Sequence, residues 1–130
     1  MTGTGERPPA ALPSDAELKL LRELWQAGEL SVRQLHERVE ADWPVGYTTV
    51  LKLLQRMHDK GLVSRHEAGR AHLYRAVTGE EALERRLVRD FLARTFDGSV
   101  ERLLQRALPD RAADSDELQE IRRLLDRLEE

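Results

Sequence analysis

Apolar side chains recur every three or four residues near the start of the chain, the spacing that gathers them on one face of a helix. The first such pattern consists of Leu18, Leu21, Leu24 and Trp25. It follows Ser14-Asp15-Ala16-Glu17, which has the S-x-x-E form of a capping box, and it stops at Gly28. The sequence therefore predicts a helix over residues 14–27.

Two more helices are predicted directly after the first. Ser31-Val32-Arg33-Gln34 repeats the capping pattern and opens a short helix that ends near Glu40. Trp43-Pro44 cannot continue that helix, because proline lacks an N–H and disfavours helical geometry in the residue before it. The next apolar pattern predicts a third helix over residues 47–60, which Gly61 ends. Its inward positions are Val50, Leu53, Leu54 and Met57.

The pattern then changes from helical spacing to alternation. Leu62–His66 and Ala71–Val77 are short runs that contain Val, Leu and Tyr, and the segment between them has Gly69 in the turn. These features predict a β-hairpin. Three short helices and a hairpin in about 65 residues are typical of a winged helix-turn-helix, which we expect over residues 14–78.

Helical spacing returns in residues 79–130. Thr78-Gly79-Glu80-Glu81 is another capping sequence, Asp97-Gly98-Ser99 separates the first two helices, and Pro109 ends the second. A third helix carries apolar residues at steps of three and four, so the expected fold is mainly α with a small β-hairpin.

These C-terminal helices carry apolar stripes that so short a segment cannot bury by itself. We expect a second copy of the chain to cover the stripes, which makes residues 79–130 a helical dimerisation domain. The alternative is that these helices fold back on the N-terminal domain. The expected dimer-interface residues are Leu83, Leu87, Phe91, Leu92, Leu103, Leu104, Leu118, Ile121 and Leu125.

Composition narrows the class of protein. The chain has 130 residues and no cysteine, which excludes disulfides, thiolate metal centres and cysteine nucleophiles. Residues 1–13 show no periodicity and are expected to form a disordered leader. No apolar run approaches the ~18 residues that span a bilayer, and the N-terminus lacks the regions of a signal peptide. We therefore expect a cytoplasmic protein with no membrane partner.

The formal charge of −3 hides an uneven distribution. Residues 47–76 contain six basic and two acidic side chains, a local charge of +4. Residues 79–130 contain ten arginines and fourteen acidic side chains, a local charge of −4. A basic middle followed by an acidic end indicates that one part faces a polyanion and the other faces protein or water.

The outward face of the predicted third helix carries short hydroxyl side chains near its start and long hydrogen-bond donors one turn later. That set suits insertion into the major groove of DNA, and the hairpin is expected to track phosphates or the adjacent minor groove. The expected DNA-binding residues are Tyr47, Thr48, Thr49, Lys52, Gln55, Arg56, Arg65 and Arg70. Taken alone, such a helix face would be interpreted as an ordinary solvated surface. Because the helix stands directly before a basic hairpin, a DNA-binding surface is the favoured interpretation.

Other classes of function find less support. The sequence has no glycine-rich phosphate loop, nucleophile elbow or His-x-x-x-His pair, so we expect no enzyme activity and no cofactor. The spacing of the four histidines indicates no metal site. The main alternative is a winged-helix protein-interaction module that does not bind DNA. A regulator with a ligand pocket built from Leu and Phe also stays open.

The run Tyr47-Thr48-Thr49-Val50-Leu51-Lys52-Leu53-Leu54-Gln55-Arg56-Met57, with Lys60-Gly61-Leu62-Val63 and Gly69-Arg70-Ala71-His72-Leu73-Tyr74, resembles the penicillinase-repressor family of BlaI/MecI type. The resemblance covers nearly everything from Leu12 to Leu128. It implies a homodimeric transcriptional repressor whose winged helix binds inverted-repeat operators in double-stranded DNA, often with TACA/TGTA half-sites. By position, Thr48, Thr49 and Lys52 would then face bases, and Arg70 would lie in the wing.

The chain departs from the family pattern at three points. A family operator usually meets threonine where this chain has Lys52, so a different half-site preference is expected. Members that answer β-lactams are cut by a membrane sensor-protease at an Asn-Phe bond, where this chain has Arg106-Ala107. Members that answer copper use a C-terminal cysteine cluster, which this chain lacks. We therefore expect DNA binding by this chain to be regulated by an inducer or a regulatory protease of another kind.

Overall fold

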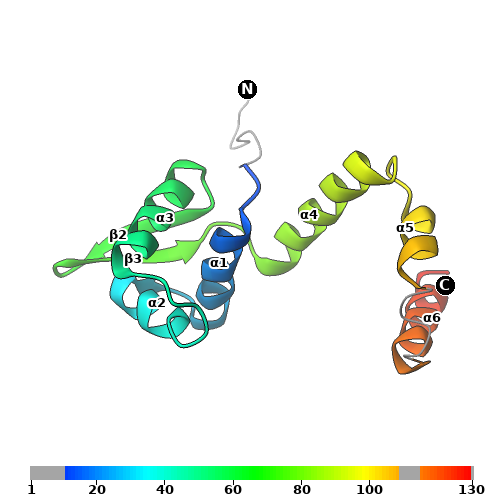
Figure 1. Cartoon of the computed structure of the whole chain (residues 1–130), viewed down its shortest axis with the longest axis horizontal. Coiled ribbons are helices and arrows are strands. Elements are labelled where there is room, and N and C mark those ends of the chain that lie inside the picture. The colour runs from blue at the N-terminus through cyan, green and yellow to red at the C-terminus, as the bar shows by residue number, and fades with distance from the viewer. Residues whose placement is uncertain (1–10, 109–114, 130) are drawn as a thin grey trace. The chain divides into compact units, whose positions relative to one another are not determined.

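The structure is a computed structural model that describes residues 11–108 and 115–129. In chain order its elements are α1 (Asp15–Ala27), β1 (Leu30–Ser31), α2 (Val32–Val39), α3 (Tyr47–Asp59), β2 (Val63–Ala68), β3 (Ala71–Ala76), α4 (Glu80–Thr95), α5 (Val100–Ala107) and α6 (Ser115–Glu129) (Figure 1). The expectation of a mainly α fold with a small β-hairpin is confirmed. Two compact units, Met1–Arg85 and Arg86–Glu130, are described separately below.

The first two helices begin where the capping sequences predict. Ser14 Oγ accepts a hydrogen bond from the Glu17 amide at 3.2 Å, and the Ser14 amide donates to Glu17 Oε1 at 2.8 Å. Ser31 and Gln34 make the same reciprocal pair at the start of α2, with distances of 3.2 and 2.9 Å. Each pair satisfies backbone N–H groups that the first helical turn leaves without a partner.

The apolar faces of α1, α2 and α3 form the core of the first unit, together with Tyr74 from β3. In α3 the buried residues are the four that the sequence predicts. In α1 the prediction is partly wrong: Leu20 is fully buried, whereas Leu18 and Trp25 are half-buried. The indole Nε1 of the half-buried Trp25 donates to the Thr78 carbonyl oxygen at 3.0 Å, which satisfies the polar edge of the ring.

The hairpin is confirmed, and its first strand runs two residues further toward the turn than predicted. Strands β2 and β3 pair without a break from Val63–Ala76 to Ala68–Ala71, which leaves Gly69 and Arg70 as a two-residue turn. Gly69 has a φ of 65°, a conformation that glycine adopts without a steric penalty. The sequence did not predict β1, which pairs with β3 and gives the order β1-β3-β2. Two residues are too few to show alternation.

A buried ion pair joins α1 to the end of α3. Glu17 is fully buried, and Lys60 Nζ lies 2.7 Å from its Oε1. Burial disfavours the carboxylate, but the hydrogen bonds from Lys60 and from the Ser14 amide outweigh it and hold the pKa of Glu17 below its ordinary value. Glu17 Oε2 has no hydrogen-bond partner in the described part of the chain, so this carboxylate depends on Lys60.

We expect Lys60→Ala to lower the free energy of unfolding by about 2 to 3 kcal/mol near neutral pH, because it leaves a buried carboxylate unpaired. A folded-state pKa below the unfolded value stabilises the fold above the unfolded pKa, and that contribution is lost as pH falls through the folded pKa. The deficit of the variant should therefore shrink in acid. Urea titrations at about pH 7 and about pH 3 measure both effects.

Arg85→Ala is the matched control, because the Arg85–Glu81 pair is exposed and should contribute little. Equal losses for Lys60→Ala and Arg85→Ala, or a Lys60→Ala deficit that does not change with pH, would contradict the assignment.

The second unit keeps a set of large apolar side chains exposed. Phe91 packs edge-on against Phe96 with ring centroids 5.7 Å apart, yet remains 45% exposed. The other large apolar residues that are exposed in the described part of the unit are Val88, Val100, Leu124, Leu125 and Leu128. The predicted break between its first two helices is confirmed, with Asp97 and Gly98 at positive φ and Ser99 capping α5.

Some sequence predictions fall on residues that the structure does not describe. Most of the predicted disordered leader, residues 1–10, lies outside the described residues, as do Pro109 and the polar segment after it. Among the described residues, none of the helices is long and apolar enough to cross a membrane.

Candidate nucleic-acid interface

Helix α3 presents a polar, exposed face on the side away from the core. It begins after Gly46, and Tyr47 at its first position is 47% exposed. Thr48, Thr49 and Lys52 are exposed on the first turns, and Gln55 and Arg56 are exposed one turn later. The face therefore combines short hydroxyl groups with long donors, as expected for reading base edges.

His36 of α2 contacts both the segment that leads into α3 and the first residue of that helix. Its Nε2 lies 2.9 Å from the Val45 carbonyl oxygen, within hydrogen-bonding distance. The imidazole also packs edge-on against the Tyr47 ring, with centroids 6.1 Å apart. Because one contact holds the connecting segment and the other holds the first residue of α3, His36 orients the start of the helix.

The two faces of the hairpin differ in their charge partners. Residues that pair directly across two strands share a face, so Arg65 and Tyr74 lie on one side and His66 and Arg75 lie on the other. Arg75 Nη2 and His66 Nδ1 approach Glu29 Oε2 at 3.6 and 3.7 Å. Arg75 therefore has an acidic partner within the protein, whereas Arg65 on the opposite face has none among the residues that the structure describes.

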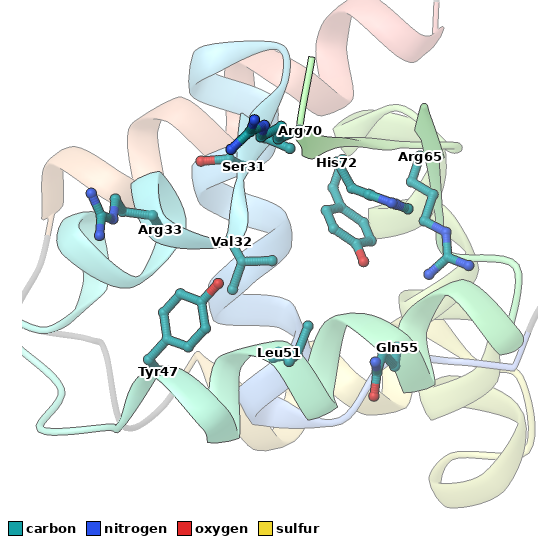
Figure 2. Close-up of a pocket in the computed structure, with 11 residues that line it drawn as sticks. Ser31, Val32, Arg33, Tyr47, Leu51, Gln55, Arg65, Arg70 and His72 are labelled. Atoms are coloured by element: carbon teal, nitrogen blue, oxygen red, sulfur yellow. The ribbon is translucent and has the colours of Figure 1, made fainter. Parts of the chain in front are cut away.

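A groove of about 490 Å³ lies between the start of α2, helix α3 and the hairpin (Figure 2). The helical side is lined by Ser31, Val32, Arg33, Tyr47, Leu51 and Gln55. The hairpin side is lined by Arg65, Arg70, Ala71, His72 and Tyr74. Four predicted DNA-binding residues thus meet in one groove, while the other four lie on the exposed face of α3 beside it.

Arg33 lines the groove but was not among the predicted DNA-binding residues. It stands in the first turn of α2, where the capping sequence Ser31-Val32-Arg33-Gln34 indicates the start of a helix and no ligand. The strand pairing of Leu30 and Ser31 with β3 brings this turn next to the hairpin. The sequence pattern does not predict this two-residue strand, so it cannot predict that Arg33 lies next to the hairpin.

The lysine and arginine side chains of the groove and of α3 have no ion-pair partner among the described residues. Elsewhere in the first unit, Arg38 pairs with Glu23, Lys60 with Glu17 and Arg75 with Glu29. The lysines and arginines of the first unit with no ion pair or side-chain hydrogen bond to a described residue are Lys19, Arg22, Arg33, Lys52, Arg56, Arg65 and Arg70. Five of these seven lie on α3 or around the groove, and the other two lie on α1, so most of the uncompensated positive charge of the described first unit is concentrated at α3 and the groove.

The predicted dimer-interface residues differ in exposure. Leu83 and Leu92 are buried within one chain, whereas Phe91 and Leu125 are 45% and 47% exposed. The remaining predicted residues, Leu87, Leu103, Leu104, Leu118 and Ile121, are half-buried.

Comparison with known proteins places this arrangement in a family. The model of the family described as penicillinase repressor matches residues 13–127. The chain belongs to the penicillinase repressor family. The transcriptional regulator BlaI of Mycobacterium tuberculosis strain H37Rv is 35% identical over 116 residues, which cover 88% of this chain and 83% of that protein.

More distant members of the penicillinase repressor family agree. The penicillinase repressor of Bacillus licheniformis is 21% identical over 113 residues, 87% of this chain and 88% of its own. The monomeric form of B. licheniformis BlaI, solved in complex with the blaP half-operator, has a similar fold, with a TM-score of 0.50 and 22% identity. That match covers 56% of this chain and 89% of that one. The family consists of transcriptional repressors and not of enzymes, as expected from the sequence.

Proposed function

We propose that the protein represses transcription as a homodimer bound to an inverted-repeat operator in double-stranded DNA. The observation that carries this proposal is the exposed face of α3, where Thr48, Thr49 and Lys52 stand beside a groove lined by arginines that have no ion pair with a described residue. Membership of a repressor family and the similar fold of a relative solved with its half-operator support it.

In this proposal, α3 of each copy enters the major groove, and two copies occupy successive grooves on one side of the DNA, about 34 Å apart. Thr48, Thr49 and Lys52 contact base edges, and the basic residues nearby contact phosphates. A promoter occupied in this way is closed to polymerase. Arg65 and Arg70 add affinity and register more than choice of sequence.

The second copy is proposed to cover the exposed apolar residues of the second unit. Phe91, Val100 and Leu125 are too exposed to contribute fully to the stability of a single chain. Covering them in a two-fold interface removes that apolar area from water and holds two DNA-binding units together. Affinity then rises because the second half-site binds at a high effective concentration.

A protein-docking role for the same surface is less consistent with its composition. The described part of α3 exposes hydroxyl, amide and cationic groups, with Tyr47 as its exposed aromatic residue. Protein interfaces are enriched in aromatic residues and depleted in lysine at their centres. The charge pattern fits a polyanion better.

Selection of bound fragments from genomic DNA tests the proposal. We expect retained fragments to share an inverted repeat whose half-sites are centred one helical turn apart or a multiple of it. Retention of no fragment by the full chain, or retention without any shared sequence, would overturn sequence-specific repression. Genes next to the retained fragments would also point to the inducing signal, which in this chain does not act through an Asn-Phe bond or a cysteine cluster.

A further inference from the structure

The groove between α2, α3 and the hairpin combines an apolar floor with a cationic rim. Val32, Leu51 and Tyr74 come from α2, α3 and β3 and supply apolar surface. Arg33 lies on one side of the groove and Arg65 on the other, and Figure 2 shows the Arg65 side chain pointing from β2 toward α3. Arg70 adds a third guanidinium from the turn.

None of the described carboxylates lines this groove. Elsewhere in the described first unit some arginines are paired with acidic residues, as in the Arg38–Glu23 pair at 2.8 Å, although Arg22 is not. Three arginines held near one another without counter-charge repel each other, so an anionic occupant gains from all of them.

We propose that the groove seats the sugar–phosphate backbone of one DNA strand, with Arg33 of α2 as a phosphate contact opposite Arg65 and Arg70. This inference rests on the proposed DNA-binding function and adds a third element, α2, to the helix and hairpin already implicated. Deoxyribose packs on the apolar floor, and guanidinium groups meet phosphate oxygens with paired N–H donors.

The position of the groove selects a strand of DNA over a small anion. Tyr47 and Gln55 line the groove and also belong to the helix that carries Thr48 and Lys52. A duplex that places its base edges on α3 must therefore run one backbone past the helix on this side, between α3 and the hairpin. The groove is then filled whenever α3 is engaged.

The first test compares Arg33→Ala with Arg22→Ala in the full chain on the selected operator. Arg22 is exposed on α1, lacks an ion pair with any described residue and does not line the groove, so it matches Arg33 in charge only. We expect Arg33→Ala to weaken binding about tenfold per half-site, equally for operator and unrelated duplex, and to lower the salt slope by about 1 per half-site. Arg22→Ala should change neither quantity.

Two further arms identify the ligand group. Arg33→Lys keeps the charge but not the paired donors, so the salt slope should return while affinity recovers only in part. A second experiment replaces single phosphates of the operator with neutral methylphosphonates. At the phosphate that Arg33 contacts, the replacement should weaken binding by the wild type but should not weaken binding by Arg33→Ala further, because both changes remove the same contact.

The outcomes separate this inference from the function on which it rests. Unchanged affinity and salt slope in Arg33→Ala, on DNA that the wild type binds, would overturn the groove assignment and leave the repressor function standing. Additive losses at every methylphosphonate position would also overturn it. Competition by inorganic phosphate at constant ionic strength, without any dependence on duplex phosphates, would show that the groove binds a free anion instead. Failure of the wild type to bind any duplex would refute the proposed function itself.

Discussion

Phe91→Asp is expected to convert the protein to a monomer and to weaken operator binding by about 10²- to 10⁴-fold. Phe91 packs against Phe96 yet is 45% exposed in a single chain, and in the proposed dimer an apolar partner surface covers the rest of the ring. A carboxylate placed twice in a two-fold interface would be desolvated next to its symmetry mate and would oppose association. Loss of the linkage between half-sites then removes the gain from effective concentration.

Ala93→Asp is the matched control for this prediction. Two residues along an α-helix correspond to about 200°, so Ala93 lies on the other side of α4 from Phe91, and it is exposed. It introduces the same charge without touching the proposed interface. Sedimentation at several concentrations should give monomers for Phe91→Asp and dimers for Ala93→Asp and for the wild type. Dimeric Phe91→Asp would show that the interface lies elsewhere.

The double variant Thr49→Ala/Lys52→Ala is expected to lose about 2 to 5 kcal/mol of discrimination between operator and unrelated DNA. Both side chains are exposed and neither has an ion pair with a described residue, so their removal should leave stability almost unchanged. The cost falls on specific binding because these residues are proposed to meet base edges, whereas phosphate contacts remain. Titrations with operator and with a scrambled duplex give the discrimination directly.

Arg70→Ala provides the contrasting variant for this test. Because it is proposed to contact the backbone, its loss should weaken operator and scrambled duplex by the same factor and lower the salt slope. Equal discrimination in the wild type and in Thr49→Ala/Lys52→Ala would refute the assignment of α3 as the reading helix. Urea titration of all three proteins shows whether any loss comes from unfolding.

Much of the first unit could be predicted from local chemistry. Ser14 and Ser31 begin helices because their hydroxyls accept backbone hydrogen bonds, and a capping partner three residues later makes the signal readable. The inward face of α3 was predictable because helical spacing fixes which side meets the core. Gly69 marked the hairpin turn because few other residues adopt its φ of 65°.

The features that the sequence did not reveal depend on contacts between distant residues. Leu30 and Ser31 form a strand only because β3 offers a free edge, so the local sequence alone does not predict β1. The same pairing brings Arg33 to the groove, and the sequence gives no measure of that distance. Glu17 looked like a capping residue alone, yet Lys60, 43 positions later, makes it part of a buried ion pair.

DNA binding through α3 and the groove is tested most directly by the affinity of the full wild-type chain for a selected operator duplex at about 50 mM and about 200 mM salt. We expect tight binding at the lower salt concentration and a loss of about 10³-fold or more at the higher one, because the basic residues of α3 and the groove displace counterions from several phosphates. Absence of binding to any duplex at the lower concentration would contradict it.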